Sequence, residues 1–324
     1  MNKEEMLVLE LAGETQAAAL GAGVNEALAD ESAAVVEIMR HVAKLRGLAG
    51  RVESTEESAF EMEKFGVQAY TDGDDITDGT DPTYTTINAQ SLVQFLDSAA
   101  EDIQYGVKLS PKLLKQARQD PGRFLARYRA SLAEALAQKE DVYIGSVLCN
   151  SDTSDSVTAL FGGSAVDVDT LQSGDVFTAT LLEDMIDQFK EQTVHEPTDL
   201  VIFSRGARQL RDDARKLNDA EYRTVVKEDG SRVTMYGDIV VHEIGGSTIL
   251  PYATNGSGVD YNCAVLLSKP TAFGLVDFEA VKFYVAQPDP TIDGANFHRM
   301  LVTESVECKI LDADSLVLAK VAKL

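Results

Sequence analysis

The residues best suited to chemistry in this sequence are aspartates gathered in one short segment. From Tyr70 to Tyr84 the chain reads YTDGDDITDGTDPTY, which is dense in Asp, Gly and Thr. Calcium prefers several oxygen ligands, and five side chains here could offer them: Asp72, Asp74, Asp75, Asp78 and Asp81. An EF-hand count from Asp74 fails, because Ile76 occupies the third position and no Glu stands at the twelfth. We therefore expect a solvated acidic loop, with a cation site as the weaker alternative.

Motifs for catalysis are missing from the sequence. It has no Gly-Lys pair for a phosphate-binding loop and no Gly-x-Ser-x-Gly elbow. His195-Glu196 and His242-Glu243 lack a second histidine at zinc spacing, and no nucleophile is visible near His41 or His298. We expect neither a cofactor nor an enzymatic activity. An acidic hydrolase, with a carboxylate pair assembled from distant positions, stays open as an alternative.

The composition is strongly acidic. The net charge of −24 and the pI near 4.5 argue against a grip on nucleic acid phosphates, which needs a basic surface. Like charges repel unless salt screens them, so a saline, halophilic setting and simple solubility are equally good explanations. The three cysteines, Cys149, Cys263 and Cys308, lie far apart and form no CxxC pair, which favours buried free thiols.

The sequence also bears on location. The N-terminal MNKEEMLVLELAGET carries acids inside its apolar run, and no stretch of 18 apolar residues occurs. We expect a protein that is made in the cytosol, without a signal peptide and without a membrane partner.

One long helix organises the predicted fold. Residues 120–148 begin with Asp120 as a cap and Pro121 at the first helical position. Apolar residues recur along one face: Leu125, Tyr128, Leu132, Leu136, Tyr143 and Val147. At about 1.5 Å per residue the helix would run roughly 40 Å, as a spine for the other elements.

Two segments before the spine cannot form a hydrophobic core of their own. Residues 26–45 form an amphipathic helix that must pack either on its own core or on a neighbouring subunit. Residues 66–107 contain no Lys or Arg, and 65–70 and 84–88 could pair as a ribbon around the acidic loop. Residues 92–107 read as a helical start followed by an extended stretch. The ribbon needs a partner surface.

After the spine, the pattern alternates helix and strand. An amphipathic helix at 180–192, an apolar strand at 199–203 and a helix from Ser204 precede a hairpin of 222–227 with 232–235, whose tip is Asp229-Gly230. The remaining alternating strands are 237–243, 263–267, 280–285, 300–308 and 315–321. The last of these are expected to return beside the spine, which makes the fold class α+β.

This order of elements, with its local motifs, resembles the major capsid protein of tailed double-stranded DNA viruses, the Hong Kong 97-type fold. The matching segments are Val107 to Ser110, AEALAQKEDVYIGSVL of the spine, Pro197 to Ser204, Tyr236 to Val241, Ala264 to Leu267 and Ala272 to Val276. Each motif alone has low specificity, and their order carries the resemblance, which covers residues 56–321.

The resemblance implies a shell subunit and a division of the chain. It implies an N-terminal arm (1–55), an extended loop with its flanks (56–92, hairpin 66–88), a peripheral domain (93–165 and 270–324) and an inserted axial domain (166–269). Tyr70, Asp78, Pro82 and Tyr84 would lie over an adjacent subunit. Asp229 and Gly230 would point towards the axis of a pentamer or hexamer. The subunit would enclose DNA in the virion after assembly in the host cytoplasm. The acidity noted above would suit a halophilic archaeal host.

The chain departs from the family in two ways. The extended loop has no lysine for a covalent cross-link, so the shell would depend on buried area, overlapping arms or cement proteins. Only some fifty residues precede the loop, fewer than a fused scaffolding segment needs, so we expect a separate scaffolding protein or a mature chain, besides a portal protein. A nanocompartment shell with the same fold, similar to encapsulins, remains an alternative.

Overall fold

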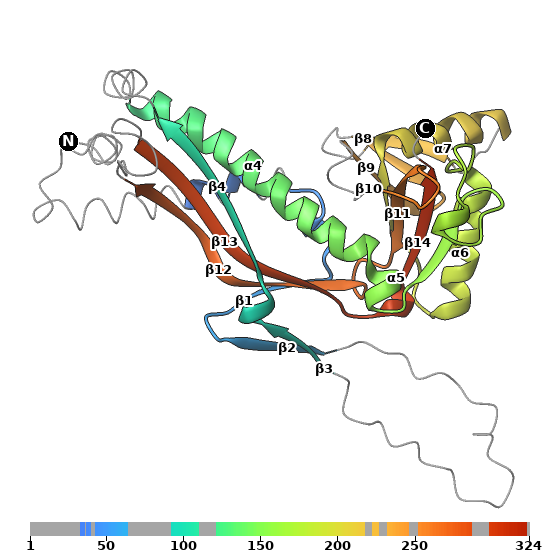
Figure 1. The fold of residues 1–324 in the computed structure, drawn as a ribbon, viewed down its shortest axis with the longest axis horizontal. Coiled ribbons are helices and arrows are strands. Elements are labelled where there is room, and N and C mark those ends of the chain that lie inside the picture. Colours follow the sequence, from blue (N-terminus) through green and yellow to red (C-terminus); the bar gives the residue numbers. More distant parts are fainter. Residues whose placement is uncertain are drawn as a thin grey trace, which may run out of the picture.

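The computed structural model describes residues 33–63 except 36 and 40–42, and then 92–109, 121–217, 222–226, 232–245, 252–286 and 298–322. These residues form an elongated molecule with a sheet-and-helix body at each end of its long axis (Figure 1). A two-stranded ribbon lies below the first body in that view.

The first body is a four-stranded sheet with helix α4, Pro121–Cys149, lying along it (Figure 1). The strand order is β1-β12-β13-β4, with β1 parallel to β12 and the other neighbours antiparallel. The bounds are β1 Arg51–Ser54, β4 Glu101–Leu109, β12 Phe273–Ala286 and β13 His298–Ile310. Helix α4 confirms the predicted spine. Its fully buried apolar side chains are Leu132, Ala133, Leu136, Ala137, Ile144 and Leu148.

The second body is an eight-stranded sheet with helices α6, Ala179–Gln192, and α7, Ser204–Leu217. Its order is β5-β14-β11-β6-β9-β8-β7, and β10 also pairs with β11. The bounds are β5 Thr158–Phe161, β6 Asp199–Phe203, β7 Tyr222–Val226, β8 Arg232–Tyr236, β9 Ile239–Ile244, β10 Tyr252–Thr254, β11 Asp260–Leu267 and β14 Leu316–Ala322. Helices α6 and α7 pack on this sheet, and the spine also contacts β11. The predicted helices, strand and hairpin of this unit are confirmed.

The C-terminal strands divide between the two bodies. Strand β13 pairs with β4 near the spine, as expected, but β14 pairs with β11 and β5 in the eight-stranded sheet. The expectation that 315–321 packs beside the spine is therefore wrong. Every residue of β14 is buried, and a strand buried on both faces needs a position inside a covered sheet.

The predicted helical start at residue 92 is also wrong. Leu92–Leu96 is strand β3, which pairs antiparallel with β2, Ala59–Glu63, and a short 3-10 turn at Asp97–Ala99 follows. The sequence LVQFL has apolar spacing that suits either structure. The partner strand, some thirty residues earlier, decides in favour of the strand.

The segment before β1 packs on the molecule's own core. Residues 33–35 and 37–39 are helical, and a 3-10 turn at Arg46–Leu48 follows. Val35, Met39, Leu45 and Leu48 are buried in the main hydrophobic cluster. The helix predicted at 26–45 is expected to pack either on the chain's own core or on a neighbouring subunit. The described part of it packs on the chain's own core. Three further short helices are α5 Ser151–Ser154, η3 Val168–Thr170 and η4 Ala313–Ser315.

Candidate assembly surfaces and their anchoring

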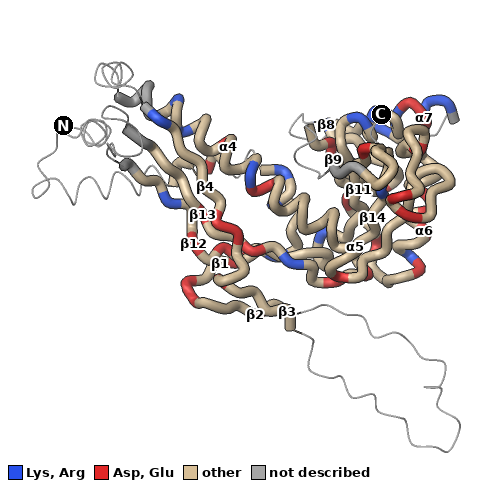
Figure 2. The backbone as a smooth tube through the Cα atoms, in the orientation of Figure 1, with Lys and Arg blue, Asp and Glu red and all other residues tan. Residues whose placement is uncertain are grey.

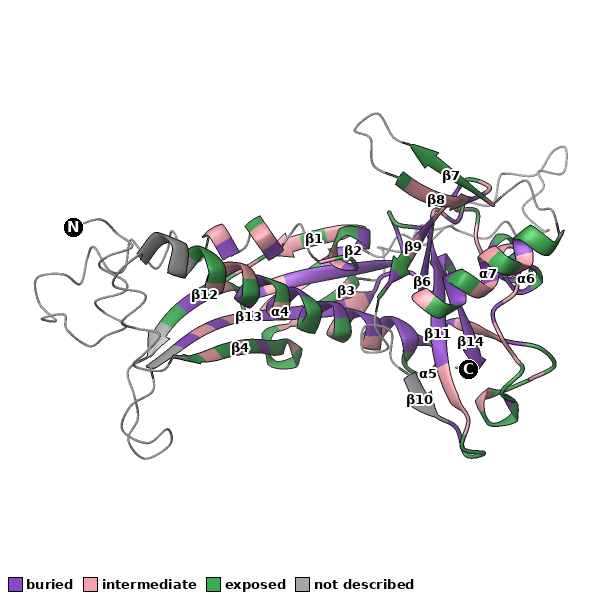
Figure 3. Cartoon of the chain, turned by 90° about the horizontal axis from the view of Figure 1, so that it is seen from above, coloured by how far each residue is buried: buried purple, intermediate pink, exposed green. Residues whose placement is uncertain are grey.

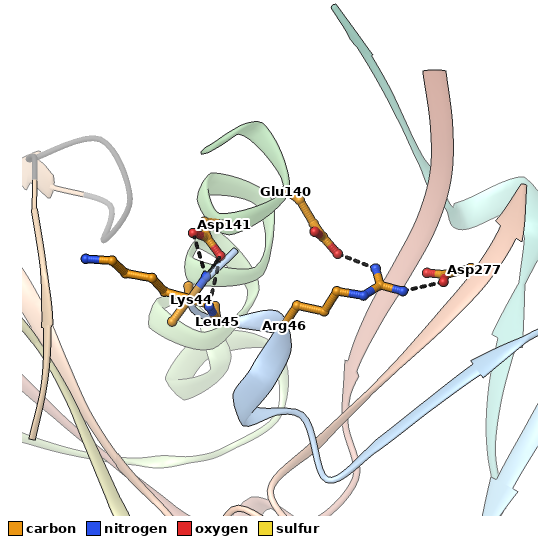
Figure 4. Close-up of polar contacts among 6 residues, drawn as sticks. All are labelled: Lys44, Leu45, Arg46, Glu140, Asp141 and Asp277. Atoms are coloured by element: carbon orange, nitrogen blue, oxygen red, sulfur yellow. Dashed lines mark hydrogen bonds and ion pairs between the residues drawn. The ribbon is translucent and has the colours of Figure 1, made fainter. Parts of the chain in front are cut away.

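A mostly buried arginine, Arg46, anchors the N-terminal segment to both the spine and the four-stranded sheet. The Arg46 guanidinium donates to Glu140 of α4 and to Asp277 of β12 (Figure 4). The Arg46 side chain is 16% exposed and that of Glu140 is fully buried. Glu304 of β13 lies within electrostatic range of all three. We call Arg46, Glu140, Asp277 and Glu304 the arm junction.

The backbone next to the arm junction is held by a second acid. The Asp141 carboxylate accepts hydrogen bonds from the Lys44 N–H at 3.1 Å and the Leu45 N–H at 2.9 Å (Figure 4). Glu140 and Asp141 are neighbours on α4, yet they contact different parts of the same turn. Gly50 then passes so close to the β11–β12 turn that a Cβ there would lie 2.5 Å from the Pro270 carbonyl oxygen. The chain between 44 and 50 is therefore tightly positioned.

The arm junction holds more acid than base. Burial raises the pKa of Glu140 to about 7, although Arg46 opposes the shift. Burial and the charge of Glu140 raise the pKa of Glu304 to about 9. Burial also raises the pKa of Asp141 against the two backbone hydrogen bonds. One buried oxygen each of Glu140, Asp277 and Glu304 has no hydrogen-bond partner. Proton uptake therefore neutralises excess negative charge at this site.

Sequence reasoning missed the arm junction, although one signal was present. Leu132, Leu136, Ile144 and Leu148 are buried at steps of one or two helical turns, and Glu140 occupies the position between the middle two. An acid in the middle of an apolar row requires a buried cationic partner. The sequence alone could not say that this partner is Arg46, 94 residues earlier.

The ribbon of β2 and β3 packs on the four-stranded sheet through apolar side chains. Its cluster consists of Met62, Phe95, Val276, Phe278 and Leu311. Gly274 makes the approach possible, because a Cβ there would lie 2.8 Å from the Met62 sulfur. The Leu96 N–H also donates to the Glu307 carboxylate at 2.5 Å. The ends of the predicted loop at 56–92 are thus fixed to β12 and β13.

The candidate site residues from the sequence lie outside the described residues. This holds for the aspartates Asp72, Asp74, Asp75, Asp78 and Asp81, for Tyr70, Pro82 and Tyr84, and for the hairpin tip Asp229-Gly230. The strands that lead to both hairpins are described and paired: β2 with β3, and β7 with β8. The roles of the loop and of the tip remain predictions.

The remaining polar candidates have structural roles where they are described. His242 Nε2 lies 2.6 Å from Asp199 Oδ1 and ties β9 to β6, while the Thr198 hydroxyl donates to the same carboxylate. All three cysteines are buried and unpaired, as predicted. Within the described ranges, no cluster of three potential ligands could hold a metal ion, and no helix is long and apolar enough to span a membrane.

Helix α7 is rich in positive charge for so acidic a chain. Helix α7 carries Arg205, Arg208, Arg211, Arg215 and Lys216, and Figure 2 shows these cationic stretches on the second body. The neighbouring strands add Arg223 and Arg232. Helix α6, by contrast, presents exposed acids beside β5. The net charge of −24 thus conceals a local separation of charge.

The sequence matches no family model and no curated protein. Solved structures do match. A virus-like particle from Pyrococcus furiosus aligns with a TM-score of 0.53 at 11% identity, over 90% of this chain and 98% of that one. The capsid of Ralstonia phage GP4 aligns with a TM-score of 0.53 at 16% identity, over 84% and 85%. The SrpI encapsulin of Synechococcus elongatus aligns with a TM-score of 0.50 at 9% identity, over 84% and 85%.

These likenesses define the fold. The chain has the Hong Kong 97-type capsid fold, so the predicted fold class and the resemblance in fold are confirmed. At identities of 9–16% the similarity is one of fold.

Proposed function

We propose that this chain is a major capsid protein that assembles into the icosahedral shell of a tailed double-stranded DNA virus. The observation that carries the proposal is the match to capsid structures over most of the chain, which covers 84% of this chain and 85% of the other in the phage GP4 case. The described architecture supports it, because the arm and the ribbon are both anchored to the body by their ends. Segments held in this way can reach neighbouring copies.

Electron microscopy of the purified chain tests this function. We expect negative-stain images to show closed particles or capsomer rings, and sedimentation velocity to show large assemblies. A monodisperse monomer over the range from tens of millimolar to molar salt would contradict the proposal.

A nanocompartment shell is the second candidate, and the match to the SrpI encapsulin favours keeping it. The two functions differ in what the particle encloses. A viral shell yields nuclease-protected double-stranded DNA, whereas a nanocompartment yields an enclosed protein that binds the lumen through a peptide. Mass spectrometry and nucleic acid extraction on particles purified from the native source separate them.

We infer that the domains follow the division expected from the resemblance. An arm (1–55), an extended loop (56–92), a peripheral domain (93–165 and 270–324) and an axial domain (166–269) would each have a separate role in the shell. The pairing of β5 and β14 with β11 favours adding these two strands to the axial unit.

The extended loop is proposed to lie over an adjacent subunit and the tip at Asp229-Gly230 to face the capsomer axis. Replacing residues 66–88 by a short Gly-Ser linker tests the first role. The variant should fold, with wild-type circular dichroism, but form no closed particles. Normal particle yield from this variant would contradict the role.

The acidity supports two further parts of the proposal. An acidic inner wall would leave packaged DNA free to slide, because it offers few phosphate contacts. Repulsion within a chain of net charge −24 would loosen particles when salt falls from molar to tens of millimolar. Light scattering across that dilution tests the salt effect, and an unchanged signal would contradict it. Assembly with cement, scaffolding and portal proteins, in the host cytoplasm, completes the proposal.

A further inference from the structure

Charged groups of opposite sign gather at the two ends of the eight-stranded sheet: arginines near β7, where Glu243 is also close, and acids beside β5. Strand β5 is the last strand at one end and β7 at the other. Beside β7, the cationic side chains Arg211, Arg215 and Arg232 make no ion pair among the described residues. We call these three residues the basic edge. Arg211 and Arg215 belong to this end because both act electrostatically on Tyr222 of β7.

The β5 end has an acidic groove. It has a volume of about 520 Å³ and lies between α6 and β5. Asp184, Asp187 and Glu191 line it from α6, and Phe161 and Val166 line it from the other side. Val166 is 78% exposed. We call these five residues the acidic groove.

Each end also presents exposed apolar side chains. On β7, Val225 is 36% exposed and Val226 is 62% exposed, and Figure 3 shows this strand almost wholly exposed at the margin of the molecule. Valines flanked by arginines at one end match Val166 and Phe161 flanked by acids at the other. Apolar centres rimmed by complementary charge are typical of protein interfaces.

We propose that the basic edge of one copy of this chain docks into the acidic groove of the next copy. The inference rests on the proposed shell function, which supplies neighbouring copies. Because the two surfaces differ and lie at opposite ends of one sheet, the contact is head-to-tail. Repetition of such a contact closes into a ring when the rotation between copies allows it.

Salt alone does not test this contact. Raising the salt concentration weakens the attraction between the two surfaces but relieves repulsion between the acidic chains as a whole. Charge reversal separates the two effects. When the charges of both surfaces are reversed in one chain, the contact is altered but the net charge of the chain stays the same.

The experiment uses three variants of the full chain. Arg211→Glu with Arg215→Glu reverses the basic edge, and Asp184→Lys with Asp187→Lys reverses the acidic groove. Each should lower the yield of rings and particles at least tenfold by sedimentation velocity, with wild-type circular dichroism. The chain carrying all four changes should regain assembly. Arg211→Lys with Arg215→Lys is the control that keeps the charge and should assemble normally.

The outcomes are distinct. If both reversed variants assemble normally, the proposed contact is overturned. The contact is also overturned if the four-change chain folds but fails to assemble. Neither result contradicts the shell function. If the wild type binds duplex DNA and the reversed basic edge loses this binding while assembling normally, α7 serves nucleic acid and the proposal is overturned. An unchanged chain that stays monomeric overturns both proposals. Should the α7 variant not fold, Arg232→Glu combined with Glu191→Lys repeats the exchange at other exposed positions.

Discussion

Two segments are attached to strands β12 and β13 by different means: the N-terminal segment through the arm junction, and the β2–β3 ribbon through the apolar cluster around Phe95, which we call the ribbon base. The arm junction uses Arg46 between buried carboxylates, with three carboxylate oxygens unpartnered. The ribbon base packs Phe95 and Met62 against Val276, Phe278 and Leu311. Charged contacts respond to protons and to the loss of one partner, whereas apolar contacts respond to volume. The arm junction is therefore held mainly by contacts that respond to pH, and the ribbon mainly by packing that does not.

Removal of Arg46 should have the largest effect. Arg46→Ala leaves the buried Glu140 and the partly buried Asp277 without their cation, which should cost about 3 kcal/mol or more of the free energy of unfolding. Urea denaturation of the subunit measures it. Arg51→Ala is the control, because its pair with Glu53 is about 40% exposed and should be worth about 1 kcal/mol or less. Equal losses in the two variants would contradict the role of burial.

Truncation at the ribbon base should come next. Phe95 is fully buried, so Phe95→Ala should cost about 3 kcal/mol in lost packing. Hydrogen exchange should show faster exchange in β2 and β3 while residues 43–50 keep their protection. Equal loss of protection at the arm junction would show that the two attachments are coupled rather than independent.

The pH dependence distinguishes the two regions further. The folded state holds protons on Glu140 and Glu304 up to pH values of about 7 and about 9, whereas the unfolded chain releases them at the ordinary carboxyl pKa. Their contribution to stability is thus complete below that ordinary pKa and is lost as pH rises through about 7 and 9.

Glu304→Gln tests this dependence, because an amide mimics the protonated acid and cannot ionise. The variant should be at least about 2 kcal/mol more stable than the wild type at pH 8, and the difference should shrink towards pH 5. Thermal melts over this pH range measure it. The exposed Glu134→Gln should keep the wild-type slope, and a parallel profile for Glu304→Gln would refute the assignment.

The smallest effect is expected at Asp141. Asp141→Asn keeps the size of the side chain but weakens its acceptance from the Lys44 and Leu45 N–H groups, at a cost of about 1 kcal/mol. Amide exchange at those two positions should accelerate. Unchanged exchange would show that Arg46 alone holds the turn.

Local patterns predicted much of the fold. The spine, the helix at 180–192, the apolar strand at 199–203 and the hairpin of β7 and β8 each show their structure within a short window, through periodicity or a turn signal. The two errors, at Leu92–Leu96 and Leu316–Ala322, concern strands whose partners lie elsewhere in the chain. Pairing over long distances leaves no mark in the strand itself.

The amino-acid sequence by itself determined the order of elements, the acidity and the family resemblance, because periodicity, composition and motif order are properties of the chain. Only the tertiary structure brought Arg46 to Glu140 and Asp277, and placed the basic edge and the acidic groove at opposite ends of one sheet. These arrangements depend on which strands pair and in what order. Strand pairing and order are decided by the free energy of burying the whole core, and each segment contributes only part of that free energy.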